Sequence, residues 1–330
     1  MNTAEIRGVE DAHLARFYAR KPLAIVSGKG AVVFDAEGRE YVDCAGGYGT
    51  CLVGHAHPAV AEAIEQQARK LISCHGSTYN DARARLLSKL VSILPPEHDR
   101  VFLSNSGAEA VECAIKVSRK FTGRRKIIAF KNGYHGKTQG ALSATWDSKY
   151  RKSFEPLVPD FTHITYGNFE AAKEAISNDT AAVLVEPIQG ESGIRVPPPD
   201  WLPLLRDLTH DTGALLVADE IQTGFGRTGK ILLVNISRSD PISSAWRKGL
   251  LVACQSGSLH QVRKLCVPWR LESTQAPMAV IRSYAQPRKQ QSASSSRSNL
   301  SRTRRRSALT SSKNFSRCRM SCGSYERLGG

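Results

Sequence analysis

Two kinds of hydrophobic pattern follow one another in the first hundred residues. Residues 24–43 alternate apolar and polar positions around glycine-containing turns, which predicts the strands of antiparallel hairpins. Residues 58–71 and 81–93 instead repeat apolar side chains at helical spacing, and Asn80 or Asp81 can cap the second helix. The chain therefore begins with hairpin strands followed by two helices.

From Arg100 onward, short apolar segments alternate with amphipathic ones. Strands are predicted at 100–103, 126–130, 181–186 and 214–220. Helices are predicted at 108–121, 168–177 and 201–211. Strands that are apolar on both faces and joined by helical crossovers indicate a mostly parallel sheet between helix layers, an α/β fold. Ligands of such sheets bind beyond the carboxyl ends of the strands.

The charge changes abruptly along the chain. Residues 1–230 hold 28 Lys+Arg and 27 Asp+Glu, whereas residues 231–330 hold 18 and 3. The segment 292–313 has neither helical nor strand periodicity and is typical of a disordered basic linker. Only this tail therefore carries the excess of basic residues that would suit binding to nucleic acid.

Several further classes are not expected from the composition. The first thirty residues contain no secretory signal, and no apolar run reaches the roughly 20 residues that span a bilayer, so we expect a cytoplasmic protein without a membrane partner. We expect no metal site and no disulfide, since the cysteines form no CxxC pair. The eight cysteines are at positions 44, 51, 74, 113, 254, 266, 318 and 322.

The segment SNSGAEA (104–110) joins a predicted strand to a predicted helix. Backbone N–H groups at Ser106, Gly107 and Ala108 would then open at a helix N-terminus, where unpaired donors and the helix dipole favour a phosphate. A simple turn with a helix cap is the alternative for this segment taken alone.

Asp219 ends the apolar strand ALLVADE. A carboxylate there needs a cationic partner, because an unpaired buried charge is costly. A protonated pyridine nitrogen of a cofactor would serve, and so would an arginine.

Two further strand ends carry polar groups. Tyr134 and His135 follow the strand 126–130, where an aromatic ring can stack on a flat cofactor, although a surface loop is the alternative. Glu186 ends the strand 181–186, and Glu191 lies in the glycine-bounded loop after it. Substrate contact and a solvated loop remain open for this last pair.

In this order and spacing, the four segments resemble the class III pyridoxal-phosphate aminotransferases, most closely the acetylornithine/ornithine group, which includes LysW-lysine-type enzymes. DAEGREYVD (35–43), AGGYGTCLVGHAHP (45–58) and GALSAT (140–145) extend the resemblance, which covers residues 20–230. It implies a fold type I transferase. Residues 1–55 would belong to a small domain, 56–230 to an incomplete cofactor-binding domain, and 231–330 to a tail without regular structure.

The resemblance also implies roles for individual residues, with pyridoxal 5′-phosphate as the cofactor. Its phosphate would be held by the Ser106 segment, its ring nitrogen by Asp219, and its ring faces by Tyr134 and Ile221. The remaining expected contacts are His135 and Gln222 for the cofactor, and Tyr48, Lys137, Glu186 and Glu191 for the substrate. Lys137 departs from the family, which usually has arginine there, so a point charge replaces a bidentate group.

The lysine that bonds to the cofactor in this family lies roughly 30 residues beyond the aspartate. Lys248 is at that distance, but its neighbours do not match the family. If each codon after Lys230 is read from its third base, however, the codons CCG ATA TCA TCT GCT TGG CGA AAG GGN for PISSAWRKG (241–249) give DIICLAKG, which resembles the family's lysine segment. Residues 272–282 become INTSTYGGNP, which resembles its second phosphate-binding segment. We therefore interpret residues 231–330 as an out-of-frame translation and expect this chain to be inactive.

The expected reaction of the gene is transfer of the terminal amino group of ornithine, acetylornithine or a related N-acylated diamino acid to 2-oxoglutarate, by a homodimer. Two alternatives stay open. One is another class III enzyme, such as an aminomutase or another omega-transaminase. The other is a nucleic-acid binder using RTRRRS (302–307), which is the weaker hypothesis because only the tail supports it.

Overall fold

The computed structural model describes residues 1–94, 98 and 100–233, and in addition the backbone of three strands, 243–246, 251–255 and 280–282. The first part contains a three-stranded antiparallel sheet, β1 (Ile25–Lys29), β2 (Val32–Asp35) and β3 (Glu40–Val42). The predicted hairpins in 24–43 are thus confirmed. The helices of this part are α1 (Thr3–His13), α2 (Gly46–Gly49), α3 (Pro58–Lys70) and α4 (Asp81–Ile93).

Local signals explain the helix boundaries. Pro58 begins α3, where its missing N–H costs no hydrogen bond. Asn80 caps α4 by accepting a hydrogen bond from the Arg83 amide. The capping box of α1, formed by Asn2 and Glu5, is a helix start that the sequence analysis missed.

Residues 1–94 have almost no core of their own. Among them, only Ala24, Asp35, Leu90 and Leu94 are buried. The helix α3 has no buried residue, although its apolar positions follow a regular helical spacing. The part of the chain that packs tightly begins near Phe102.

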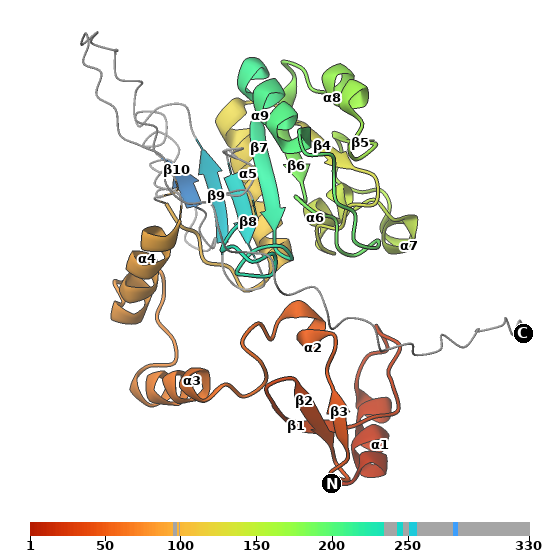
Figure 1. Ribbon diagram of the computed structural model, residues 1–330, viewed down its shortest axis with the longest axis vertical. Coiled ribbons are helices and arrows are strands. Elements are labelled where there is room, and N and C mark those ends of the chain that lie inside the picture. The colour runs from red at the N-terminus through yellow and green to blue at the C-terminus, as the bar shows by residue number, and fades with distance from the viewer. Residues whose placement is uncertain (95–97, 99, 234–242, 247–250, 256–279, 283–330) are drawn as a thin grey trace, which may run out of the picture. The chain divides into compact units, whose positions relative to one another are not determined.

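A seven-stranded sheet with the order β10-β9-β8-β7-β6-β4-β5 organises the rest (Figure 1). Its strands are β4 (Lys126–Phe130), β5 (Phe161–Ile164), β6 (Thr180–Val185), β7 (Leu215–Glu220), β8 (Ser243–Trp246), β9 (Leu251–Gln255) and β10 (Val280–Arg282). Every pairing is parallel except that of β8 with β9. Every residue of β6 and β7 is buried, as expected for strands covered on both faces.

Helices cover this sheet as the alternating pattern predicted. They are α5 (Gly107–Thr122), α6 (Gln139–Ala144), α7 (Ser148–Arg151) with the short 3-10 helix η1 (Lys152–Phe154), α8 (Phe169–Ala175) and α9 (Trp201–Thr212). α5 packs along β6 to β9, and α9 packs on β6 and β7. The left-handed Gly123 and Gly213 end α5 and α9, where a side chain would be strained. The α/β class predicted from the sequence is confirmed.

The structure differs from the expected elements in two places. Residues 100–103 form no strand, and only Phe102 makes a single bridge, yet its side chain is 2% exposed in the core. A short apolar run signals burial without specifying a ladder. In the tail, where no regular structure was expected, three strands of 3–5 residues extend the sheet. Strands of 3–5 residues are too short for hydrophobic periodicity to be recognised in the sequence.

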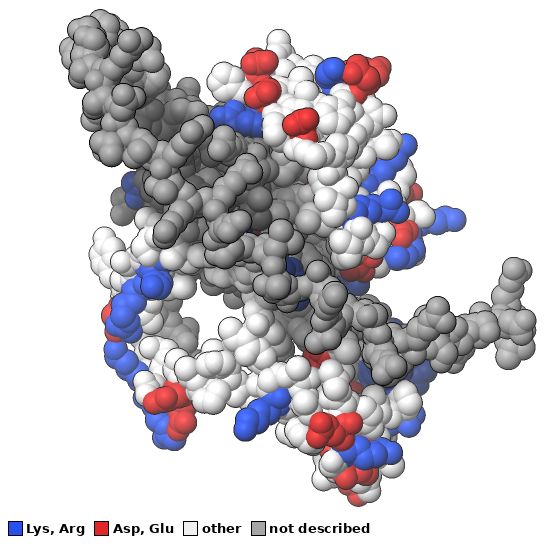
Figure 2. Space-filling model, viewed as in Figure 1, with Lys and Arg blue, Asp and Glu red and all other residues white. Residues whose placement is uncertain are grey.

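Charged side chains of both signs are interspersed on the face shown in Figure 2. This agrees with the near balance of acidic and basic residues in 1–230. Among the described residues, no helix is long and apolar enough to cross a bilayer.

An aromatic cluster anchors α9 to the sheet. Trp201 is fully buried, and its ring meets those of Phe130, Tyr166 and Phe169 edge-on at centroid distances of 5.4, 6.0 and 5.6 Å. Such contacts add to the burial energy of the large side chain. The cluster joins three elements of the α/β part.

Trp201→Ala is expected to lower the free energy of unfolding by about 3–5 kcal/mol, because it leaves a large cavity among these rings. Urea unfolding followed by circular dichroism measures the loss. Trp201→Phe is the matched control. It keeps an aromatic ring and removes an indole N–H that has no hydrogen-bond partner in the described part of the chain, so its cost should be smaller. Equal losses for the two variants would contradict this explanation.

Candidate functional site

Four loops that follow the strand ends or open α5 approach each other closely at glycine residues. A Cβ atom built on Gly107 would lie 2.8 Å from Cδ1 of Ile221, and one on Gly136 would lie 2.7 Å from Cβ of Ala108. A Cβ on Gly190 would lie 3.1 Å from Cδ of Gln222. The α5 N-terminus therefore touches both the loop after β7 and the loop after β4, as the placement of polar clusters in the sequence predicted.

The N-terminus of α5 is closed by a capping box. Ser106 Oγ accepts a hydrogen bond from the Glu109 amide at 3.2 Å, and Glu109 Oε2 accepts from the amides of Asn105 and Ser106 at 2.5 and 3.2 Å. The cap uses the Ser106 amide, which the sequence analysis expected to be open. The amides of Gly107 and Ala108 are the helix-terminal donors that the cap does not use, and they keep this end suited to an anion.

Asp219 finds its cationic partner in His135. Its Oδ2 lies 2.7 Å from Nδ1 of His135, and both side chains are buried. Burial by itself lowers the pKa of His135, but the hydrogen bond and charge of Asp219 outweigh it, so that the pKa is raised. The buried pair is therefore an ion pair, and the arginine considered from the sequence is not the partner that the structure places there.

The second oxygen of Asp219 connects the pair to α5. Oδ1 accepts a hydrogen bond from the Ile221 amide at 3.1 Å, and the side chain of Ile221 is the group that meets Gly107. A buried carboxylate and an anion-binding helix end thus contact the same residue.

Glu186 ties two of the loops together. Its Oε1 accepts from the Tyr134 amide at 2.8 Å and its Oε2 from the Gly190 amide at 3.3 Å. Burial raises the pKa of Glu186 to about 7, against the lowering effect of the His135 charge. Glu186, predicted from the resemblance to contact substrate, thus hydrogen-bonds the backbone of the loops after β4 and β6.

A group of aromatic and charged side chains lines the exposed side of the site. The rings of Tyr134 and Tyr150 meet at 5.4 Å, and the Tyr150 hydroxyl donates to Glu191 Oε1 at 3.0 Å. Lys137 Nζ lies 5.0 Å from the ring centre of Tyr18 and 5.3 Å from that of Tyr150. Burial raises the pKa of Tyr134 to about 12, which keeps its phenol neutral at ordinary pH.

Tyr18 and Tyr150 were not identified from the sequence. Each lies in a segment with no strand-end position or glycine turn to mark it. The only available signal was chemical, because an exposed lysine in a tyrosine-rich neighbourhood favours cation–π contacts.

Two other predicted site residues are placed differently. Gln222 is exposed beside Gly190. Tyr48 is 88% exposed on the α2 turn, with φ of 52°. Lys248 lies outside the described residues. Contacts thus join His135, Asp219, Ile221 and the start of α5, whereas Gln222 and Tyr48 are exposed.

The chemistry of the converging groups fits a flat, anionic, nitrogen-containing cofactor. Gly107 and Ala108 offer amide donors, Asp219 offers a buried negative charge, and Tyr134 and Ile221 offer aromatic and aliphatic surfaces. A protonated ring nitrogen would satisfy the carboxylate that His135 alone now neutralises.

Comparison with known proteins points the same way. The sequence model of the family described as "Aminotransferase class-III" matches residues 14–241. The chain is 49% identical over 226 residues to an acetylornithine aminotransferase of Methanopyrus kandleri, an alignment that covers 68% of this chain and 58% of the relative. It is 45% identical over 218 residues to a LysW-aminoadipate semialdehyde/glutamate semialdehyde transaminase of Sulfolobus acidocaldarius, covering 66% of this chain and 56% of the relative.

A solved structure shares the fold. The ornithine aminotransferase of Toxoplasma gondii, described with partial occupancy of PLP at its active site, superimposes with a TM-score of 0.70 at 34% identity. The match covers 74% of this chain and 59% of that one. The chain thus spans less than two thirds of the length of these three proteins.

Glu186→Gln is expected to flatten the pH dependence of stability between pH 4.5 and about 7. Because the folded-state pKa of Glu186 is raised, its contribution to stability is complete below pH 4.5 and is lost as the pH rises through 7, by roughly 3 kcal/mol. Urea unfolding at intervals across this range measures the slope. The exposed Glu191→Gln is the control, and identical slopes for the native chain and Glu186→Gln would refute the assignment.

Proposed function

Because the chain belongs to the class III aminotransferases, we propose that its α/β part is the cofactor site of an enzyme that moves the terminal amino group of ornithine, acetylornithine or a related N-acylated diamino acid to 2-oxoglutarate. The family and its PLP-containing structural neighbour indicate pyridoxal 5′-phosphate as the cofactor. The observation that carries the proposal is the shared contact of Asp219 and Gly107 with Ile221.

The cofactor roles follow from the donor set. The amides of Gly107 and Ala108, with Ser106 as the helix cap, would hold the phosphate. Asp219 would pair with the ring nitrogen, and Tyr134 and Ile221 would cover the two ring faces. Gln222, exposed at the rim, would bond the ring hydroxyl. These assignments are supported by the convergence of the loops on α5.

Different residues of this chain would have different roles in the reaction. When bound, pyridoxal 5′-phosphate supplies an electron sink for the carbanion formed at the donor carbon. Asp219 would hold a proton on the ring nitrogen, and the contact of its Oδ2 with His135 Nδ1 at 2.7 Å fixes the position of the carboxylate. Glu186 fixes the backbone of Tyr134 and thereby the ring that excludes water from one side.

The exposed group of side chains is suited to an amino acid donor. Lys137 provides a single positive charge for a carboxylate, and the rings of Tyr18 and Tyr150 limit where that charge can move. Glu191 is held by Tyr150 and would face a cationic or N–H group of the donor. Tyr48 would contribute from its turn. The names of the relatives support donors with a terminal amine and a distant carboxylate.

We further propose that residues 231–330 are translated out of frame and that this chain has little or no turnover. The family match ends at residue 241, and the alignment to the acetylornithine enzyme spans 226 residues. The excess of basic residues begins in the same region. Sequencing the DNA after the Lys230 codon tests this proposal, since an intact frame without an insertion or deletion would exclude it.

Restoring the frame should restore the chemistry. The frame-corrected protein is expected to change the absorbance of pyridoxal 5′-phosphate. It should also keep the cofactor covalently bound after borohydride reduction, because the corrected frame contains the lysine that bonds to it. Replacing that lysine with alanine should abolish the retention. The chain as printed should retain none.

The donor and acceptor are tested on the corrected protein. Glutamate formed from 2-oxoglutarate with ornithine, acetylornithine or a longer N-acylated diamino acid identifies the donor. Turnover without any keto acid would indicate an aminomutase instead. Nucleic-acid binding that is lost in salt and on deletion of the tail would favour the basic-tail alternative.

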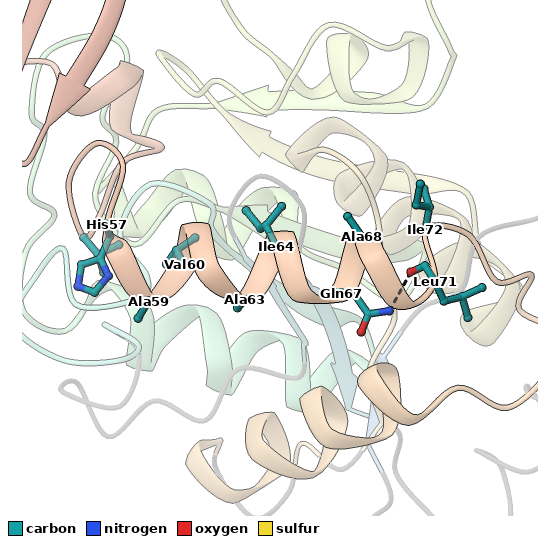
Figure 3. Close-up of a pocket in the computed structure, with 10 residues that line it drawn as sticks. His57, Ala59, Val60, Ala63, Ile64, Gln67, Ala68, Leu71 and Ile72 are labelled. Carbon is teal, nitrogen blue, oxygen red and sulfur yellow. Dashed lines mark hydrogen bonds between the residues drawn. The ribbon is translucent and has the colours of Figure 1, made fainter.

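The exposed face of α3 supports the expected homodimer. Figure 3 shows the apolar side chains Val60, Ile64 and Ala68 along one side of the helix, with Leu71 and Ile72 at its end, beside a shallow pocket of about 570 Å³. Ile64 is 64% and Ile72 is 87% exposed. Contiguous apolar surface of this kind marks an interaction site, and we propose that a second copy covers it.

Ile64→Asp is expected to weaken dimerisation of the frame-corrected protein at least about tenfold, because it places a charge in an apolar contact. Sedimentation velocity over a range of concentrations measures the shift. Gln66→Asp adds the same charge to α3 outside the pocket and should change little. An unaltered dimer in both variants would mean that the corrected C-terminal part covers this face instead.

A further inference from the structure

A second reactive group lies outside the proposed cofactor site, in the loop that follows β3. Cys51 Sγ is 3.6 Å from Nδ1 of His55, and Nε2 of the same ring is 2.8 Å from Oδ2 of Asp43. A nucleophile, a base and a carboxylate that orients the base are thus arranged in series. This is the order of groups that activates thiols and hydroxyls in unrelated enzymes.

The imidazole is held in a fixed position. The His55 backbone exchanges two hydrogen bonds with Gly30, at 2.8 and 3.0 Å, and a Cβ on Gly28 would lie 3.0 Å from Cβ of His55. The ring is therefore anchored to the β1–β2 hairpin. With Asp43 accepting the Nε2–H, Nδ1 is left to accept the thiol proton.

Asp43 is also held in place. Its Oδ2 accepts from the Gly47 amide at 2.7 Å and its Oδ1 from the Ala45 amide at 3.0 Å. The hydrogen bond to His55, followed by that from Gly47, lowers the pKa of Asp43, so it is charged at neutral pH. The base and its orienting group are preorganised before any reagent arrives.

We propose that Cys51 is a nucleophilic modification site that exchanges with small disulfides. The thiol proton passes to His55 Nδ1 as the Cys51 sulfur attacks one sulfur of the disulfide. A Cys51–S–S bond forms, the S–S bond of the reagent breaks, and the departing half leaves as a thiolate that takes the proton from His55. A free thiol reverses the step.

A metal site does not explain this cluster. Across the described residues, no group of three His, Cys, Asp or Glu side chains converges in a way that could hold a metal ion. The solvent access is sufficient for a reagent, because 24% of the His55 side chain is exposed and Cys51 is half-buried.

The chain supplies its own comparison thiols. Cys44 is more exposed than Cys51, but within the described part of the chain its thiol makes no hydrogen bond to an imidazole. Cys74 is half-buried like Cys51, but its sulfur lies 3.1 Å from Thr78 Oγ1, and the neighbouring His75 ring bonds to Ser77 instead. Comparing the reaction rates of these three cysteines in one sample therefore separates the effect of solvent exposure from the effect of the neighbouring His55 base.

The test uses the full chain with 2,2′-dithiodipyridine, quenched at short times and mapped by tandem mass spectrometry, which resolves Cys44 from Cys51. Cys51 is expected to react at least about tenfold faster than Cys44 and Cys74. His55→Gln should remove this advantage, and Asp43→Asn should reduce it. The unchanged Cys74 rate and the far-ultraviolet circular dichroism report folding.

Equal rates for the three cysteines in the native chain would overturn the proposal. So would an unchanged Cys51 rate in a folded His55→Gln protein. If that variant does not fold, the native comparison and Asp43→Asn still decide. None of these outcomes depends on pyridoxal 5′-phosphate or on aminotransferase activity.

Discussion

The buried ion pair of Asp219 and His135 is the interaction on which the arrangement of the site depends. Only 3% of the Asp219 side chain is exposed, so its charge must be balanced inside the protein. His135 provides that balance from the loop after β4, while the Ile221 amide fixes the other oxygen from the loop after β7. Glu186 then joins the loop after β6 to the same group. Two buried carboxylates, Asp219 and Glu186, thus link the loops that follow three strands.

The sequence predicted helices and strands well where the hydrophobic patterns were long. The strand 126–130 and the helix 81–93 were located to the residue, because continuous apolar runs and a clear cap define them. Polar residues at strand ends also identified Asp219, Tyr134 and Glu186, since such positions meet at one edge of a parallel sheet. Contacts between segments that lie far apart in the sequence were harder to predict. Asp219 pairs with His135, 84 residues away, and Tyr150 binds Glu191. Both contacts depend on the conformation of the loops, which hydrophobic periodicity does not encode.

The two parts of the chain differ in how far their own residues stabilise them. The α/β part buries whole strands, whereas the first 94 residues bury only four side chains. Helices such as α3 form because their local sequence favours them, but most helical stability in proteins comes from a packed face. The sheet therefore provides most of the buried core among the described residues, and the N-terminal segment contributes little to it.

The close glycine contacts of the site have a consequence for how such enzymes diverge. A Cβ atom on Gly136 would lie 2.7 Å from Cβ of Ala108, and its φ of +127° is itself unfavourable for a side chain, so the approach of this loop to α5 tolerates no larger residue. Lys137 and Glu191 face solvent and meet only side chains that can move. Substitutions at these two exposed positions can therefore alter the surface of this region while the buried contacts beneath it are kept.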